Sequence, residues 1–367
     1  MPGRIQYRIL TLAALAGMNA MLCQVVFLRE ILSAAQGNEL LIGIFFFCWL
    51  AGVGVGATAG GRLADSARNP LAGACLIPAV QVLLSPAIFL FLTSCRTILG
   101  IPAGTFMPPG AFLAASAIAA GLFSCLTGLG FPFLCRAARA SSLSGDVSIG
   151  SVYATDALGS IVAGVLFTFV LVSRLSPIHI ILLSGLGVWI AIVFALSSGE
   201  IRKAAMMPAS VLGLLWAALL FSPAGTQLNE WGQSLRWHAL APGFEHVRTE
   251  ETPYQRLDLG AREGQFSLFS HGNYAGSFPD PYSAAEAAHL VMTLCPRPER
   301  VLLLGGGSPE LVREILKHPV RHLDYIEMDR ALLPFLEPYL DEEVRNTLQD
   351  ARGHLRHEHH LGKSGGN

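Results

Sequence analysis

The chain has 367 residues, of which 52% are hydrophobic and only 14% charged, and its mean hydropathy is +0.49. Soluble domains carry roughly a quarter charged residues, so this balance excludes an ordinary soluble protein and favours a membrane protein. The net charge of −1 provides no basic surface, which excludes nucleic acid as a partner.

Apolar stretches follow one another through the first part of the chain. A helix needs about 20 mostly apolar residues to cross roughly 30 Å of hydrocarbon. Seven such stretches lie at residues 9–28, 40–61, 72–94, 110–134, 152–173, 177–198 and 204–222. The first shows no small-residue cleavage site, which indicates a retained helix rather than a signal peptide. We therefore expect residues 1–224 to form a polytopic helical bundle of about seven spans in the lipid bilayer of the cell inner (plasma) membrane.

Basic residues around these stretches predict the orientation. Eight fall on one side and three on the other: Arg4, Arg8, Arg62, Arg68, Arg136, Arg139, Arg202 and Lys203 against Arg29, Arg96 and Arg174. The excess of positive charge places the N-terminus in the cytoplasm. Seven spans would then put the C-terminal region outside, whereas one miscounted span would put it inside, and the sequence leaves both open.

Small residues and acids inside or beside the spans have two interpretations each. The glycines of the second span favour close helix packing over a hinge or permeation path: Gly52, Gly54, Gly56, Gly60 and Gly61. The seven cysteines form no CxxC pair, so we expect small apolar fillers and no disulfide framework. Three acids at span edges either mark a substrate route or are paired with Arg29 or solvated, which we favour: Glu30, Glu39 and Asp156.

The hydrophobic pattern changes near residue 245, where its period becomes shorter. Residues 245–280 read as short strands with turns at 260–264 and 271–273, which predicts a small β-hairpin region. Helical patterns at 282–294, 310–317 and 331–340 alternate with strand patterns at 301–304 and 322–327. This alternation predicts a partial Rossmann-like α/β domain over residues 281–352. Residues 353–367 are rich in histidine and glycine, and we expect a disordered tail rather than a metal site.

A glycine loop carries the strongest chemical signal. Gly305, Gly306 and Gly307 follow a buried-strand pattern and precede Pro309 at a helix start. Such a turn lets a ligand approach the backbone and the free N–H groups of the helix start. Glu327 follows Gly307 by 20 residues and ends the next predicted strand, where a carboxylate can hold two ribose hydroxyls. The pattern predicts a nucleoside site; the alternative is a tight turn without a ligand.

Several motifs occur in the order seen in spermidine synthases: Thr252-Pro253-Tyr254-Gln255, His271-Gly272-Asn273, Phe278-Pro279-Asp280, the glycine loop and Asp324-Tyr325-Ile326-Glu327-Met328-Asp329. With its helical half, the chain resembles the membrane-bound bacterial branch of this aminopropyltransferase family. The resemblance implies transfer of an aminopropyl group from decarboxylated S-adenosylmethionine to an amine such as putrescine, with no other cofactor.

The resemblance also implies roles for individual residues. Gln255 would contact the nucleoside, the glycine loop (Gly305 to Gly307) would lie along one side of it, and Glu327 would bind its ribose. Asp350 resembles the acid on the adenine side, and Asp280 matches an acidic position of the substrate segment.

Departures from the family pattern bear on catalysis. Ser308 stands where soluble members carry an aspartate, and Ala284 and Ala285 replace a tyrosine–histidine pair. The loop with the amine-deprotonating aspartate follows a fourth strand that residues up to Asn367 do not reach. We therefore expect aminopropyl transfer to be weakened or lost in this chain, with the catalytic residue unknown and enzyme activity open.

A further expectation follows from the short α/β region. Two or three parallel strands cannot cover both faces of such a sheet, so we expect a homo-oligomer or a partner chain to complete it. Two alternatives stay open: a membrane module for polyamine or cation transport or sensing, and a fragment of a longer transferase.

Overall fold

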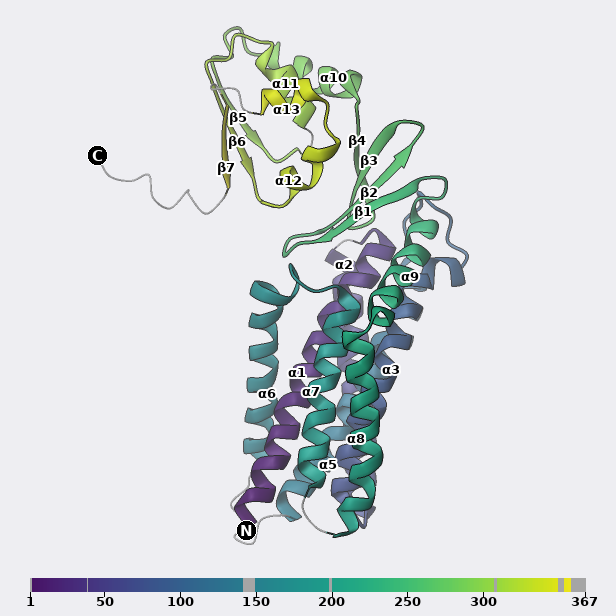
Figure 1. Cartoon of the computed structure of the whole chain (residues 1–367). Coiled ribbons are helices and arrows are strands. Elements are labelled where there is room, and N and C mark those ends of the chain that lie inside the picture. The colour runs from purple at the N-terminus through teal and green to yellow at the C-terminus, as the bar shows by residue number, and fades with distance from the viewer. Residues whose placement is uncertain are drawn as a thin grey trace, which may run out of the picture. The chain divides into compact units, whose positions relative to one another are not determined.

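The computed structural model describes residues 2–37, 39–140, 149–197, 200–306, 309–348 and 353–357 (Figure 1). The chain divides into two compact units, Met1–Pro242 and Gly243–Asn367. The first unit is helical and contains one continuous apolar core. The second contains two sheets and two smaller cores.

Long helices account for almost all of the described residues of the first unit. In chain order they are α1 (Pro2–Ala35), α2 (Glu39–Ser66), α3 (Pro70–Ile98), α4 (Pro109–Ser116), α5 (Leu122–Ala140), α6 (Ile149–Leu166), α7 (Pro177–Leu196), α8 (Glu200–Phe221) and α9 (Pro223–Leu240). Two π-helical turns, Ala117–Gly121 and Phe167–Leu171, join α4 to α5 and extend α6. Helix α1 packs against α6 and α7, and α2 packs against α5.

Within the described residues, six helical segments are long and apolar enough to cross a membrane. Residues 205–221 and 223–240 form a pair bent by 66° that would make a seventh span if it crosses as one. Each of the seven predicted stretches therefore coincides with a helix. Hydropathy did not predict α9, which is more polar than the other long helices.

The contact between α2 and α5 depends on glycine, as the sequence predicted. A Cβ at Gly60 would lie 2.6 Å from the carbonyl oxygen of Leu129, and one at Gly56 would collide with the carbonyl of Cys125. A Cβ at Gly52 would likewise collide with Ser124 of α5, whereas a Cβ at Gly54 would lie in open space. The prediction of close packing is confirmed for the face of α2 that repeats every four residues.

Two charged side chains that the sequence placed near span edges are buried. Glu30 is fully buried, and its Oε2 accepts a hydrogen bond of 2.9 Å from the Arg236 guanidinium of α9. The expectation that Glu30 is solvated is therefore wrong, because α9, which the hydropathy pattern did not predict, supplies a buried cation to this carboxylate. Arg96 is also buried and donates to the carbonyl oxygens of Ala34, Pro102 and Thr105. Glu39 is exposed.

The second unit begins with an antiparallel sheet of four strands in sequential order. Its strands are β1 (Glu245–Glu251), β2 (Arg256–Arg262), β3 (Gln265–Ser270) and β4 (Asn273–Phe278). Tight turns join β2 to β3 and β3 to β4 at the predicted places, with Gly264 at φ 84° and Gly272 at φ 77°. Both lie in the left-handed region that glycine adopts without strain.

A second sheet of three parallel strands follows α10 (Pro281–Met292). It contains β5 (Arg300–Leu304), β6 (His322–Glu327) and β7 (Gly353–His357), with α11 (Pro309–Leu316), α12 (Leu332–Leu336), a 3₁₀ turn (Glu337–Tyr339) and α13 (Glu342–Thr347) between them. Helices α10 and α11 pack on the face that carries Leu303, Leu323 and Tyr325.

The prediction of disorder from residue 353 onwards is wrong for residues 353–357. They form β7, which pairs with β6 from Leu323 opposite Gly353 to Glu327 opposite His357. The free backbone groups of β6 offer this segment a complete ladder, which outweighs its polar composition. The rest of the predicted tail lies outside the described residues.

Candidate functional site

Glu327 ends β6 at the carboxyl edge of the parallel sheet. Its side chain is only 6% exposed. Its Oε1 accepts the backbone N–H of Asp329 at 3.1 Å, and its Oε2 accepts the Tyr325 hydroxyl at 3.3 Å. Burial, and then the neighbouring carboxylate, raise the pKa of the Tyr325 hydroxyl, so it remains a donor. The acid is therefore held in one orientation before any ligand binds.

Asp329 joins this edge to the loop between β1 and β2. Its Oδ2 accepts hydrogen bonds from the Thr252 hydroxyl at 2.8 Å and from Gln255 Nε2 at 2.9 Å. The other side-chain atom of Gln255, Oε1, accepts the Ser270 hydroxyl at 2.6 Å. Gln255 and Glu327, which are 72 positions apart in the chain, are thus both hydrogen-bonded to Asp329.

The glycine turn lies beside the same edge. The Gly305 N–H donates to the carbonyl oxygen of Ile326 at 2.8 Å, one residue before Glu327. Gly305 has φ 64° and Gly306 has φ 107°, a backbone conformation that favours glycine. A Cβ added to Gly305 would meet no atom of the described residues within 4 Å, so these residues leave space beside the turn. Gly307 and Ser308 lie outside the described residues.

A cavity of about 300 Å³ opens next to this turn. Strands β3 and β4, helix α10 and the start of α11 form its walls, and Gly306, Asp280 and Glu310 contribute to its lining. The Asp280 N–H donates to Glu310 Oε2 at 2.9 Å. Hydrogen bonds from Ser283 lower the pKa of the Asp280 carboxyl, whereas burial raises the pKa of Glu310.

The structure thus brings most of the predicted residues into two adjoining groups. Gln255 and Glu327 are connected through Asp329, while Asp280 and Gly306 line the cavity. The glycine turn bridges the two groups through its bond to β6. Asp350 lies outside the described residues.

Sequence reasoning missed two acids of this region. Asp329 is 3% exposed and Glu310 is 2% exposed. The spacing of Asp329, two residues after Glu327 at the same strand end, was the available signal. Glu310 stands directly after Pro309 at the start of α11, where a carboxylate suits the helix dipole, so its position in the sequence gives no separate signal of a site.

A glycine turn after one parallel strand and a carboxylate at the end of the next are typical of Rossmann-like units that bind nucleosides. A family model described as the spermine/spermidine synthase domain matches residues 283–361. Polyamine aminopropyltransferase 2 of Ralstonia nicotianae is 29% identical over 212 residues, or 56% of this chain and 41% of that protein. The polyamine aminopropyltransferase of Leptospira interrogans is 28% identical over 218 residues, or 58% of this chain and 42% of that protein.

The chain carries a spermine/spermidine synthase domain over residues 283–361 and is similar to polyamine aminopropyltransferases. It spans about two-fifths of the length of these relatives. A solved spermidine synthase in complex with the transition state analogue AdoDATO is 24% identical, with a TM-score of 0.28, over 30% of this chain and 40% of that chain.

Proposed function

We propose that the second unit binds decarboxylated S-adenosylmethionine or a related nucleoside. The observation that carries this proposal is that Gln255 and Glu327 are both hydrogen-bonded to Asp329, beside an open glycine turn. Oriented acceptors suit the hydroxyl donors of a ribose, and the turn leaves room for the sugar to approach the backbone.

Each residue has a role in this proposal. Glu327 accepts the ribose hydroxyls, Gln255 contacts the nucleoside, and Gly305 and Gly306 form the surface beside it. Asp280 belongs to the cavity where the rest of the substrate lies. Gly307 and Asp350 keep the roles that the family resemblance implies.

We propose that aminopropyl transfer by residues 1–367 alone is weak. Attack by an amine requires a base that removes its proton, and the donor and amine must be oriented. Ala284 lines the cavity at a position where the resemblance implies a tyrosine, and its methyl group can neither donate nor accept a hydrogen bond. The amine side of the cavity is therefore less polar than in the family pattern.

Calorimetric titration of 5′-methylthioadenosine into the purified full-length chain in detergent tests the nucleoside site. We expect a dissociation constant in roughly the micromolar range and a loss of about tenfold or more in Glu327→Gln, because a carboxylate acceptor is removed. Glu337→Gln is the matched control, since Glu337 is exposed on the 3₁₀ turn. A wild-type chain that does not bind the nucleoside, or an unchanged affinity in folded Glu327→Gln, refutes the proposal.

We propose that the first unit spans the inner membrane with its N-terminus in the cytoplasm. The length and apolar character of its helices support this, and so does the excess of basic residues on one side. Reporter enzymes that are active on one side only, fused after Gly199 and after Pro242, test it. Reporters on opposite sides indicate that α8 and α9 cross as one bent span; reporters on the same side refute a seventh crossing.

We also propose that further polypeptide, from a second copy or a partner chain, covers the parallel sheet. Leu302 is 59% exposed and Leu304 is 69% exposed on β5, and the described helices α10 and α11 cover the opposite face. Parallel sheets are ordinarily covered on both faces. Light scattering of the purified chain should show an assembly that Leu302→Asp disrupts; a monomer in both proteins contradicts a homo-oligomer.

A further inference from the structure

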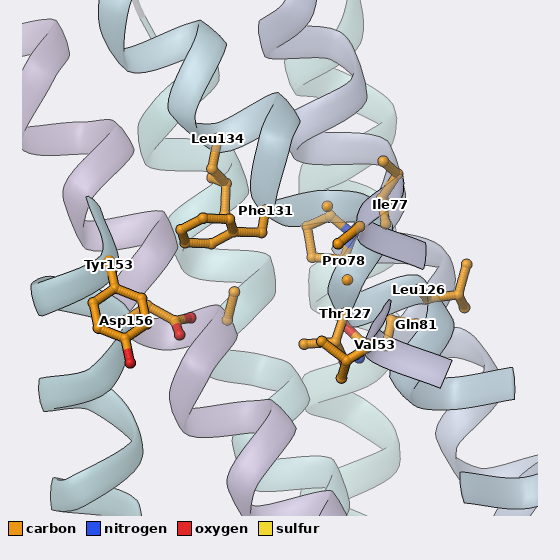
Figure 2. A pocket seen from close by; sticks show the side chains of 14 residues that line it. Val53, Ile77, Pro78, Gln81, Leu126, Thr127, Phe131, Leu134, Tyr153 and Asp156 are labelled. Carbon is orange, nitrogen blue, oxygen red and sulfur yellow. The ribbon is translucent and has the colours of Figure 1, made fainter. Parts of the chain in front are cut away.

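A cavity of about 230 Å³ lies inside the helical unit, among α1, α2, α3, α5 and α6 (Figure 2). Its walls are mostly apolar and include Val53 and Leu126. Figure 2 shows Asp156 and Tyr153 of α6 on one side of it and Gln81 and Thr127 on the other. This cavity belongs to the first unit, whereas the nucleoside site belongs to the second.

Asp156 supplies the one carboxylate that lines this cavity. The side chain is half-buried, and α1 approaches it so closely that a Cβ at Gly17 would lie 2.7 Å from its Oδ1. Among the described residues, no side chain forms an ion pair or a hydrogen bond with this carboxylate. A charge surrounded by apolar groups is costly unless a partner compensates it. The setting therefore favours a cationic ligand.

The polar group on the other side is an acceptor too. Gln81 Nε2 donates to the Thr127 hydroxyl at 2.6 Å and to the carbonyl oxygen of Phe123 at 3.4 Å. These bonds fix the amide so that its oxygen is the atom left to accept a hydrogen bond. The cavity thus offers acceptors on both sides and no cationic side chain in its lining.

The lining also selects the kind of cation. Ca²⁺ and Mg²⁺ take about six oxygen ligands, which a single carboxylate with an amide and hydroxyls among apolar walls does not supply. An ammonium group has three N–H donors, and an attached alkyl chain suits apolar walls. Sites for drug-sized ligands measure roughly 300–1,000 Å³, so this smaller cavity suits only a short chain.

We propose that this cavity binds a short aliphatic amine in its protonated form, with the ammonium group on Asp156 and the alkyl chain along the apolar wall toward Gln81. The site goes beyond the nucleoside pocket and does not depend on it. It gives the helical unit a ligand of its own.

Equilibrium binding of radiolabelled n-butylamine to the full-length chain in detergent tests the proposal, with n-butanol as the uncharged competitor. We expect saturable binding that n-butanol does not displace, because the alcohol lacks the charge. Asp156→Asn should weaken binding by roughly tenfold or more, since a charge-assisted bond is lost, and Gln81→Leu by a smaller factor. Glu39→Gln and Glu327→Gln should bind as the wild type does.

Thermal unfolding and helical circular dichroism of each variant establish that it is folded. Val53→Phe keeps the carboxylate and fills the cavity, so it should abolish binding even if Asp156→Asn fails to fold. The proposal is overturned if the wild type does not saturate, if n-butanol displaces the amine, or if folded Asp156→Asn or Val53→Phe binds with wild-type affinity. Loss of amine binding in Glu327→Gln would assign the amine to the second unit and overturn it as well.

Discussion

The substitution Asp329→Asn tests whether the buried acid between the two sheets holds the nucleoside site together. The carboxylate accepts three hydrogen bonds: two on Oδ2, from Thr252 and Gln255, and one on Oδ1, from the backbone N–H of Ala331. An asparagine of the same shape has one acceptor and one donor. Whichever way the amide is turned, its NH₂ group faces at least one N–H or O–H that formerly donated to oxygen.

The size of the effect follows from this mismatch. A buried donor left without an acceptor costs about 1–3 kcal/mol, which corresponds to roughly a 5- to 150-fold loss if the cost falls on the arrangement that binds the nucleoside. Calorimetric titration of 5′-methylthioadenosine measures it, with Asp341→Asn, an exposed position, as the matched control. Wild-type affinity in a folded Asp329→Asn protein would refute the view that Asp329 positions Gln255 against Glu327.

Three further predictions concern stability. Gly56→Leu should lower the thermal midpoint of the detergent-solubilised chain by overpacking α2 on α5, at a cost of about 1–3 kcal/mol or more, whereas Gly54→Leu should change it little. Glu30→Gln should cost about 3–5 kcal/mol in chemical unfolding because it removes the negative charge that accepts a hydrogen bond from the buried Arg236 guanidinium; a near-neutral effect would contradict this. Burial raises the pKa of Glu310 in the folded state, so the folded protein binds this proton more tightly than the unfolded chain and loses stability as the pH rises through that pKa. Glu310→Gln should reduce this loss of stability in thermal melts recorded between about pH 4 and pH 7. The same pH dependence in both proteins would contradict the prediction.

The hydropathy pattern predicted the helices well because a long, mostly apolar stretch is by itself a sufficient signal of such a helix. It missed α9, whose mixed composition becomes helical through packing on α3 and α7 and through Arg236 reaching Glu30. A sequence window cannot show that a cation 206 positions away compensates an acid. The interpretation of Glu30 as a solvated acid was therefore wrong, while the packing role of Gly52, Gly56 and Gly60 could be predicted directly from their four-residue spacing.

The α/β region shows the same division between local and distant signals. The signals for the turn at Gly305 and the acid at Glu327 are local in the sequence. A strand pattern followed by glycine identifies the turn, and a carboxylate at the end of the next strand identifies the acid. The local signal of Asp329 is only its spacing from Glu327, and its role depends on Thr252 and Gln255, which lie on the distant loop between β1 and β2. Strand β7 was missed because its ladder to β6, rather than its composition, makes it a strand.

The acids of the two proposed sites differ in their hydrogen-bond partners, and this difference argues that the two sites have different ligands. In the second unit Glu327 and Asp329 already accept hydrogen bonds from neighbouring protein groups, so a neutral sugar adds hydroxyl donors to a preorganised carboxylate. In the helical unit the Asp156 carboxylate has no such partner among the described residues, so a ligand that brings positive charge would compensate it. A nucleoside ribose suits the first acid and an ammonium group the second. Failure of one proposal would therefore leave the other standing.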